Sequence, residues 1–354
     1  MKYLIDQLRF ARTLWRAWWR TGRMDWARAL AVRGINADSA ECQNQNGLLW
    51  IGEISCIIPN PAASILLAAF DRAARLHASG IRFEHGENGV LSAIAADIIV
   101  QVETLEELQI VEEVFSSGVY NLKLPRRPLV LDVGMNSGFA SLFLSSCHSD
   151  AVVLAFEPFP PTFARAKANF RLNPAHSSRI HPQQYGLADE TRTMELDYSD
   201  VWSGSVGMFG VPEGLKATGN VRRVGTIFRD ASIVLSEALR DFPDRSVVLK
   251  IDCEGAEYGI VRRLSETGLL ERVSVILMEC HRRDSGHNPH ALCTLLVDSG
   301  FSCVHLDPNS ADISFVYAML TRPSRSPNEL HPMSGLENMP CEEAKKATIA
   351  HGSH

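Results

Sequence analysis

Apolar and polar positions along the chain divide it into regions with different periods. From about residue 129 to residue 320, short apolar runs alternate with segments in which apolar residues recur every three or four positions. The short runs predict buried strands, and the three-to-four spacing predicts amphipathic helices. Strands that alternate with helices predict an α/β fold, in which a mostly parallel sheet is covered on both faces.

Seven strands and four helices are predicted in this region. The strands span residues 129–133, 151–156, 179–187, 246–251, 272–279, 301–306 and 311–320, and the helices span residues 139–147, 161–172, 256–266 and 288–299. The stretch from residue 190 to residue 240 is long for one connection and is rich in glycine. Long connections in α/β domains often carry binding loops, so we expect an excursion over a site.

The first 33 residues predict a basic amphipathic helix. Eight basic and two acidic residues leave an excess of six positive charges there. At about 100° per residue, apolar side chains share one face and arginines share the face beside it. The apolar face holds Leu4, Leu8, Ala11, Trp15, Trp18, Trp19 and Trp26, and the basic face holds Arg9, Arg12, Arg16, Arg20 and Arg23.

Three interpretations of this helix stay open. An arginine face beside a Trp-rich face is typical of a helix that lies on an anionic membrane. A helix that docks its Trp face on the protein's own body or on a second subunit is commoner. A mitochondrial transit peptide is also rich in arginine and poor in acids, but residues 1–33 lack the serine that such peptides contain.

The rest of the chain divides at changes of pattern. Residues 46–125 predict a small mixed α/β segment, with strands near residues 48–51 and 98–100, a helix near residues 61–76, and a helix that Thr104 caps and that runs to about Phe115. Prolines and serines after residue 320 predict a disordered tail. The predicted divisions are a basic helical segment 1–45, the mixed segment 46–125, the main domain 126–322 and the tail 323–354.

Composition narrows the class of protein. The 354 residues are 45% hydrophobic and 21% charged, as in an ordinary globular protein, and the net charge of −6 argues against a nucleic-acid partner. Eight cysteines without a Cys-x-x-Cys pair predict reduced thiols and a cytoplasmic location. A Pro-Asn-Pro sequence breaks the apolar run 54–70, which argues against a membrane span. Arginines interrupt the N-terminal residues, which argues against a signal peptide.

Residues 129–138 carry the first candidate chemistry. They read Leu-Val-Leu-Asp-Val-Gly-Met-Asn-Ser-Gly, so that a buried strand ends in Asp132 and opens into a tight turn with Gly134, Asn136 and Gly138. Glu157 ends the next apolar run. A strand, a glycine turn, a helix and a second strand that ends in an acid are typical of a Rossmann-type nucleoside site.

The glycine spacing indicates which nucleoside is bound. Asn136 and Phe139 stand where a dinucleotide fingerprint has its second and third glycines, and the chain has no P-loop. The turn therefore favours a nucleoside without phosphates, and S-adenosylmethionine is the obvious one. Glu157 can accept hydrogen bonds from both ribose hydroxyls, and Asp132 can help to neutralise positive charge. An ordinary structural turn is the alternative.

A second group of charged residues lies in residues 247–257, Val-Val-Leu-Lys-Ile-Asp-Cys-Glu-Gly-Ala-Glu. Lys250 and Asp252 are two positions apart and share one face of a strand, and Asp252 lies at the carboxyl tip where open α/β sheets bind ligands. Glu254 and Glu257 open the next helix. Acids at a helix start are also stabilised by the helix dipole alone, which is the structural alternative.

The following strand ends in Glu279 and His281. A histidine there can take a proton from a substrate hydroxyl, because its ordinary pKa is about 6.5; a capping or solvated histidine is the alternative. Asp252, Glu254 and Glu279 offer oxygen ligands for a divalent cation, but we predict no metal.

Three segments resemble the FkbM family of S-adenosylmethionine-dependent methyltransferases. Residues 131–138 resemble the family's Asp-x-Gly-Ala-Asn-x-Gly motif. Residues 156–158, with Asn169 and Asn173 downstream, resemble its second motif. Residues 249–257 resemble its Lys-Ile-Asp-Val-Glu-Gly-Ala-Glu signature, the most specific of the three. Met135 and Cys253 replace the usual alanine and valine and remove no polar group.

The resemblance covers roughly residues 105–320 and implies a class I methyltransferase sheet, with seven mostly parallel strands and the last strand antiparallel, behind an N-terminal helical and mixed extension. It implies S-adenosylmethionine as cofactor. The cofactor-binding residues that it implies are Asp132, Gly134, Asn136, Gly138 and Glu157, with Asp189 at the adenine. Lys250, Asp252, Glu254 and Glu257 would line the reaction site, with Glu279 nearby.

The function expected from these observations is O-methylation of a hydroxyl on a sugar, a glycolipid or a related natural product. His281 or Asp252 is the expected base, with Lys250 and Glu254 beside it. The alternatives are a non-catalytic scaffold with a cofactor fold and an N-methyltransferase of a peptide natural product. The expected partners are a small-molecule or saccharide acceptor, a membrane surface for residues 1–33 if the helix is interfacial, and a second copy of the chain.

Overall fold

The computed structural model describes residues 2–36, 40–43, 48–60, 64–86, 89–217, 220–282, 287–306 and 313–321. The predicted tail 323–354 lies outside these residues. Within the described ranges, no helix combines the length and the apolar character that crossing a bilayer requires.

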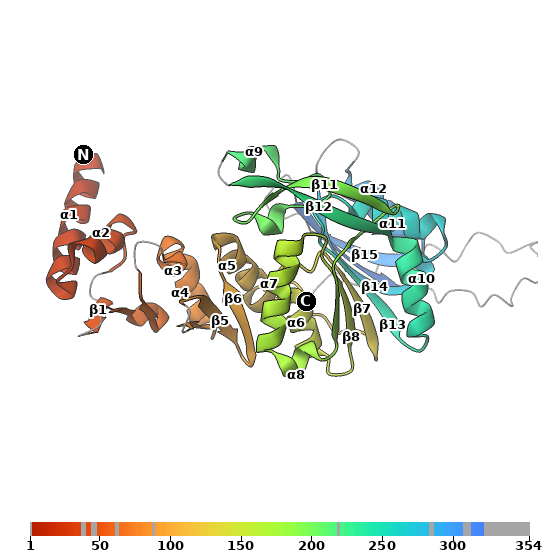
Figure 1. The fold of residues 1–354 in the computed structure, drawn as a ribbon, viewed down its shortest axis with the longest axis horizontal. Coiled ribbons are helices and arrows are strands. Elements are labelled where there is room, and N and C mark those ends of the chain that lie inside the picture. Colours follow the sequence, from red (N-terminus) through yellow and green to blue (C-terminus); the bar gives the residue numbers. More distant parts are fainter. Residues whose placement is uncertain are drawn as a thin grey trace, which may run out of the picture. The chain divides into compact units, whose positions relative to one another are not determined.

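A seven-stranded sheet forms the centre of the C-terminal part of the described chain (Figure 1). Its strand order is β15-β16-β14-β13-β7-β8-β9. β16 pairs antiparallel with β14 and β15, and all other neighbours are parallel, which confirms the predicted class I sheet. The strands are β7 (Pro128–Val133), β8 (Val152–Phe156), β9 (Ile180–Gln183), β13 (Ser246–Ile251), β14 (Val273–His281), β15 (Phe301–Leu306) and β16 (Ile313–Leu320).

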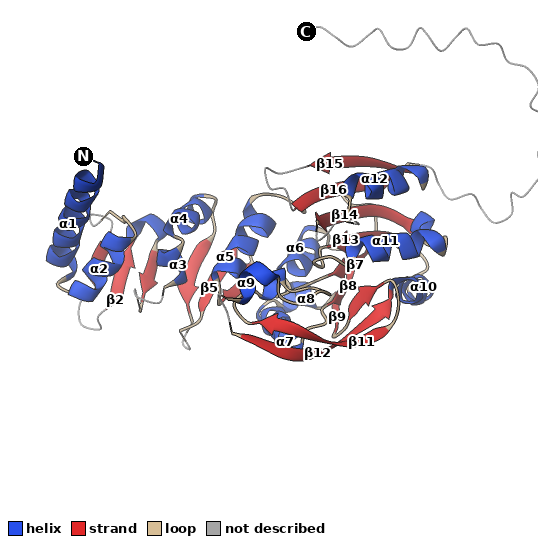
Figure 2. Ribbon diagram, turned by 90° about the horizontal axis from the view of Figure 1, so that it is seen from above, coloured by secondary structure: helices blue, strands red, loops and turns tan. Residues whose placement is uncertain are grey.

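Helices cover both faces of this sheet (Figure 2). Val130 of β7 packs with α6 and α7, whereas its neighbours Leu129 and Leu131 pack with α10 and α11. Because both faces are buried, all six residues of β7 are apolar or paired, and the strand reads as a continuous run. The helices are α6 (Phe139–Cys147), α7 (Pro160–Leu172), α8 (Pro174–Ser177), α10 (Ala231–Asp241), α11 (Glu257–Glu266) and α12 (Pro289–Asp298), with the short η6 (Leu270–Arg272).

The predicted strand 179–187 is wrong as a single strand. It divides into β9 and β10 (Gly186–Ala188), because β10 leaves the large sheet and pairs with β12 instead. A Cβ at Gly186 would lie 2.6 Å from the Phe228 ring, so a glycine lets the two strands approach.

The excursion between residues 190 and 240 contains structure that the sequence pattern did not predict. Its strands β11 and β12 join β10, which precedes the excursion, in a three-stranded sheet of order β10-β12-β11, and α10 returns the chain to the large sheet. β11 and β12 alternate between exposed and buried residues, so their apolar signal is half as dense as that of a central strand. The elements are β11 (Arg192–Ser199), η5 (Ser203–Ser205), α9 (Glu213–Lys216) and β12 (Val221–Asp230).

The described N-terminal part contains five α-helices, α1 to α5, and two small antiparallel sheets, β1-β2-β3 and β4-β5-β6. Thr104 caps α5 in a capping box with Glu107, as the sequence predicts. Asn169 and Asn173 of the second motif hydrogen-bond the backbone of β6 and so fasten this part to α7. The elements are α1 (Lys2–Thr21), α2 (Met24–Val32), β1 (Ala40–Gln43), β2 (Leu48–Ile51), η2 (Gly52–Ile54), β3 (Cys56–Ile58), α3 (Ile65–Ala68), α4 (Phe70–Ala78), β4 (Arg82–His85), β5 (Leu91–Ala95), β6 (Ile98–Val102), α5 (Leu105–Val111) and the π-helix η4 (Glu112–Ser116).

Candidate active site

The glycine turn after β7 packs against the tip of β13. Gly134, Asn136 and Gly138 all have left-handed backbone, with φ of 80°, 50° and 84°. A Cβ at Gly134 would lie 1.8 Å from the carbonyl oxygen of Asp252, and one at Gly138 would lie 2.6 Å from the Phe170 ring. Both positions therefore require glycine, and the turn is held close to the end of the neighbouring strand.

Behind this turn, Asp132 and Lys250 form a buried ion pair. The Asp132 side chain is fully buried; its Oδ1 lies 2.9 Å from Lys250 Nζ, and Ser141 Oγ donates to its Oδ2. Lys250 Nζ also donates to the Gly134 carbonyl oxygen at 2.8 Å. The structure therefore places Asp132 behind the turn, where its predicted effect on the cofactor would pass through Lys250 and Gly134.

Lys250 stays protonated near neutral pH. Burial alone would lower the pKa of its ammonium group, but the charges of Asp132 and Asp252 outweigh burial, so the pKa is raised above its ordinary value. A lysine with a raised pKa is a poor base. Its contacts suit it to fix the turn and to place positive charge beside Asp252, whose Oδ2 lies 3.8 Å from Nζ.

Glu157 is held at the tip of β8 by backbone donors. The Asn136 N–H donates to its Oε2 at 3.1 Å, and the Phe159 N–H donates to its Oε1 at 3.0 Å. Burial raises the pKa of this carboxyl to about 7. Each oxygen retains a second lone pair, so the carboxylate can still accept hydrogen bonds from a ligand.

Two adjacent cavities meet at the turn. The larger, of about 150 Å³, lies among the turn, α5, η4 and the ends of β13 and β14. The smaller, of about 40 Å³, is lined by Glu157 and by apolar side chains that include Leu187 and Phe228. Five residues line both cavities, which makes them one connected site: Gly134, Asn136, Gly204, Asp252 and Glu254.

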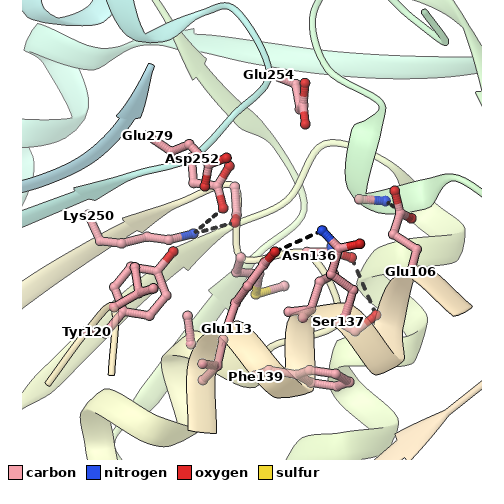
Figure 3. Close-up of a pocket in the computed structure, with 18 of the residues that line it drawn as sticks. Glu106, Glu113, Tyr120, Asn136, Ser137, Phe139, Lys250, Asp252, Glu254 and Glu279 are labelled. Atoms are coloured by element: carbon pink, nitrogen blue, oxygen red, sulfur yellow. Dashed lines mark hydrogen bonds and ion pairs between the residues drawn. The ribbon is translucent and has the colours of Figure 1, made fainter. Parts of the chain in front are cut away.

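The larger cavity is strongly acidic (Figure 3). Asp252, Glu254 and Glu279 reach it from the sheet, as predicted, and Glu106 and Glu113 reach it from the N-terminal part. Burial and the charge of Glu279 raise the pKa of Asp252 to about 6. Burial, with Glu279 and Asp252 nearby, raises the pKa of Glu113 to about 7.

Glu113 and Tyr120 are site residues that the sequence reasoning missed. Figure 3 shows both beside Lys250 and Asp252, and the Lys250 ammonium lies 5.8 Å from the centre of the Tyr120 ring. They lie outside the two strand-tip motifs, in a segment that reads as ordinary helix and loop. No sequence signal separates Glu113 from the acids around it.

His281 is held between carboxylates. Its Nδ1 lies 3.2 Å from Glu257 Oε1, and its Nε2 lies 3.4 Å from Glu254 Oε1 and 3.5 Å from Glu279 Oε1. Burial alone would lower the pKa of this imidazole, but the hydrogen bonds to Glu257 and Glu279 outweigh it and raise the pKa to about 11. A protonated imidazole cannot accept a proton, so of the two predicted bases the structure favours Asp252.

Glu257 lies behind His281. It is fully buried, lines neither cavity, and accepts hydrogen bonds from the backbone N–H groups of Gly255 and His281. Burial alone would raise the pKa of the Glu257 carboxyl. The hydrogen bond and the charge of His281 outweigh burial, so the pKa of Glu257 is below its ordinary value. Glu257 therefore orients His281 and the loop at residues 252–256.

The ligand atoms of Asp252, Glu279 and His281 lie within 4.8 Å of one another, a spacing that a divalent cation could bridge. A protonated His281 already supplies positive charge between these carboxylates. The absence of a metal stays a prediction.

Asp189 lies apart from these residues. Its side chain is about half exposed, pairs with Arg192, and lines neither cavity. Its contact with adenine also stays a prediction.

The excursion is fastened over the turn by α5. Glu106 accepts a hydrogen bond from the Gly204 N–H at 2.7 Å and another from Ser205 Oγ at 2.6 Å. Glu107 of the same helix accepts from Ser137 Oγ at 2.7 Å. The expected excursion over the site is therefore real, and its residues 203–208 form part of the cavity walls.

These residues fit S-adenosylmethionine. The smaller cavity offers the Glu157 carboxylate for ribose hydroxyls and apolar side chains for a base, while the acids of the larger cavity suit a sulfonium cation. Because Gly134 has no Cβ, the turn packs directly on the Asp252 backbone, and residues of both segments line the two cavities together. When bound, the cofactor supplies an electrophilic methyl group. The fold and this site define a class I S-adenosylmethionine-dependent methyltransferase.

Comparison with known proteins agrees. The FkbM methyltransferase domain matches residues 132–303. The chain is 30% identical over 223 residues to the methyltransferase sdnD of Sordaria araneosa, across 56% of this chain and 84% of sdnD. It is 27% identical over 171 residues to the hexuronic acid methyltransferase AglP of Haloferax volcanii, across 48% of this chain and 62% of AglP.

Among solved structures, the FkbM methyltransferase of Methylobacillus flagellatus KT is similar with a TM-score of 0.36 and 14% identity, over 56% of this chain and 45% of that one. The domain match and the similarity to sdnD establish the family to which the chain belongs. The chain belongs to the FkbM methyltransferase family.

Proposed function

We propose that the enzyme transfers the methyl group of S-adenosylmethionine to a hydroxyl of a neutral, hydroxyl-rich acceptor such as a sugar or a sugar-bearing natural product. The observation that carries this proposal is the position of Asp252. Its carboxylate lies where the two cavities meet, with a pKa raised to about 6. A base with such a pKa is ionised at neutral pH and remains strong enough to assist removal of a hydroxyl proton.

The larger cavity supports a polyol acceptor. Its walls carry carboxylates that accept hydrogen bonds from hydroxyl groups, together with the Ser205 hydroxyl and the Tyr120 phenol. The same carboxylates would repel an acceptor that carries negative charge near the reacting group. The name of the relative AglP, a hexuronic acid methyltransferase, supports a saccharide class, and the acidic walls favour a neutral sugar within it.

In the proposed reaction, Asp252 holds the acceptor hydroxyl and takes its proton as the oxygen gains the methyl group. Lys250 and His281 keep positive charge beside Asp252, so the carboxylate stays ionised before transfer. Glu157 holds the ribose. Positioning contributes much of the rate, because a sulfonium is a good leaving group.

The test distinguishes the role of Asp252 in methyl transfer from the role of Glu157 in cofactor binding. We expect Asp252→Asn to lower the methyl-transfer rate about 100-fold or more, with little change in the affinity for S-adenosylhomocysteine, because the base is lost but the cofactor contacts remain. Glu157→Gln should mainly weaken that affinity. Rates come from labelled S-adenosylmethionine with a panel of sugars, and affinities come from calorimetry.

Asp244→Asn is the matched control, because Asp244 is exposed and precedes the N-terminal end of β13, whereas Asp252 follows the C-terminal end of the same strand. Full activity of Asp252→Asn would refute the assignment of the base. A methylated amine in place of a methyl ether among the products would identify an N-methyltransferase instead. Binding of neither cofactor form by the unmodified chain would indicate a non-catalytic scaffold.

A further inference from the structure

The N-terminal helix α1 is docked by a narrow face that is neither its Trp face nor its arginine face. Ala17 and Thr21 are buried and Leu14 is packed against the core, whereas Trp15 is 61% exposed and Trp19 is 75% exposed. Thr21 Oγ caps the end of the helix by donating to the Ala17 carbonyl.

The predicted single helix over residues 1–33 is wrong, because the chain divides into α1 and α2, and Trp26 of the predicted apolar face lies on α2, buried in the core. On α1 itself, the indoles of Trp15, Trp18 and Trp19 stay exposed and are not docked on the protein's own body within the described residues.

This exposed face is large and apolar. Leu8, Trp15, Trp18 and Trp19 lie on it, with exposed fractions of 64%, 61%, 43% and 75%. These positions fall within one side of the helix at about 100° per residue. Contiguous exposed aromatic residues of this size mark an interaction surface rather than an ordinary solvated helix.

Arginines follow the edge of the Trp face. Arg9, Arg12, Arg16 and Arg20 are all exposed, and they lie on the neighbouring side of the helix. The chain as a whole has a net charge of −6, so this concentration of positive charge is local. A partner of this surface must accept indole rings and, alongside them, carry negative charge.

We propose that α1 binds the surface of an anionic lipid bilayer, with its axis parallel to the membrane plane. Indole rings partition to the boundary between headgroups and acyl chains, and arginines beside them pair with lipid phosphates and carboxylates. A second copy docked by the same face would bring two arginine rows together, which disfavours self-association. This proposal goes beyond methyl transfer and does not depend on it.

Flotation of the full chain with lipid vesicles tests the proposal. We expect binding to vesicles of phosphatidylcholine and phosphatidylserine, and much weaker binding to phosphatidylcholine alone. The double variant Trp15→Ser with Trp19→Ser should lower the partition constant by at least about tenfold, because it loses two indole rings that would be buried in the bilayer. Arg9→Gln with Arg12→Gln should lower it by roughly 25-fold, at about fivefold per arginine near an anionic surface.

Arg171→Gln with Arg262→Gln is the matched control, because it removes the same charge from exposed sites outside α1. It should leave vesicle binding nearly unchanged. A thermal shift with S-adenosylhomocysteine checks that each variant is folded. No binding of the unmodified chain to anionic vesicles, or equal binding by the Trp variant, would overturn the proposal. A dimer in sedimentation that the same Trp variant dissociates would overturn it in favour of a second copy.

Discussion

At the scale of single residues, the site is governed by how its carboxylates are neutralised. Asp132 forms an ion pair with Lys250, and Glu257 forms one with His281. Glu157 accepts hydrogen bonds from two backbone N–H groups. Asp252 is paired less closely than Asp132, since Lys250 Nζ lies 3.8 Å from its Oδ2 and 2.9 Å from the Asp132 carboxylate. A loosely paired carboxylate therefore faces the space where the acceptor would bind.

The pKa of Asp252, raised to about 6, predicts the pH profile. A carboxylate acts as a base only when it is ionised, so kcat/KM for the acceptor, measured with the cofactor saturating so that the Glu157 titration near pH 7 does not enter, should rise through pH 6. His281, with a pKa raised to about 11, should contribute no step between pH 5 and pH 9. The profile is measured with a neutral sugar acceptor. A rising limb at pH 6 that persists in Asp252→Asn would contradict this explanation.

Glu113 should make the stability of the free enzyme depend on pH. Its pKa is raised to about 7 from an unfolded value near 4.3, so folding favours the protonated carboxyl. Stability from this group is therefore present at low pH and is lost as the pH rises from about 4 through 7. Glu113→Gln should raise the melting temperature at pH 8 and leave it almost unchanged at pH 5.

Exposed Glu266→Gln is the control for this measurement, because it removes the same charge from the surface. Thermal unfolding of both variants at the two pH values gives the comparison. Equal shifts for Glu113→Gln at pH 5 and pH 8 would show that Glu113 does not titrate as proposed.

At the scale of elements, α5 and the excursion form one wall of the site. Glu106 joins them through the Gly204 N–H and the Ser205 hydroxyl, and Glu107 ties the same helix to Ser137 in the glycine turn. A helix from the N-terminal part thus orders a loop about 100 residues away in sequence. Burial raises the pKa of Glu106, yet its two donors show that it functions as an acceptor.

Glu106→Ala should therefore release the loop at residues 203–208. We expect KM for the acceptor and Kd for S-adenosylhomocysteine to rise roughly tenfold, because hydrogen bonds to a charged acceptor are lost. Ser205→Ala, which removes one of the two donors, should have a smaller effect in the same direction. Initial rates and calorimetry measure both quantities. Unchanged KM and Kd in Glu106→Ala would mean that the loop is held by other contacts.

At the scale of the whole molecule, residues 2–321 combine a methyltransferase domain with an N-terminal part that supplies Glu106, Glu113 and Tyr120 to the larger cavity. Asn169 and Asn173 lie in the second family motif, and their side chains hydrogen-bond the β6 backbone. Part of what resembles the second motif thus fastens the two parts together.

Much of the fold could be predicted from the sequence because its signals are local. Buried strands read as apolar runs, and the glycine turn and the strand-tip acids follow them directly, so Gly134, Glu157 and Asp252 were found from their neighbours alone. The strands β11 and β12 of the small sheet were missed because exposed residues interrupt their buried positions and dilute the apolar signal.

The sequence by itself determined the nucleoside-binding turn, the order of the central elements and the acids at the strand tips, because these depend on spacing within short segments. Only the tertiary structure decided which acids are neutralised, that His281 holds its proton, that Glu113 and Tyr120 join the site, and that α1 leaves its Trp face exposed. Charge interactions and burial depend on distances between segments far apart in the chain, and no local pattern encodes those distances.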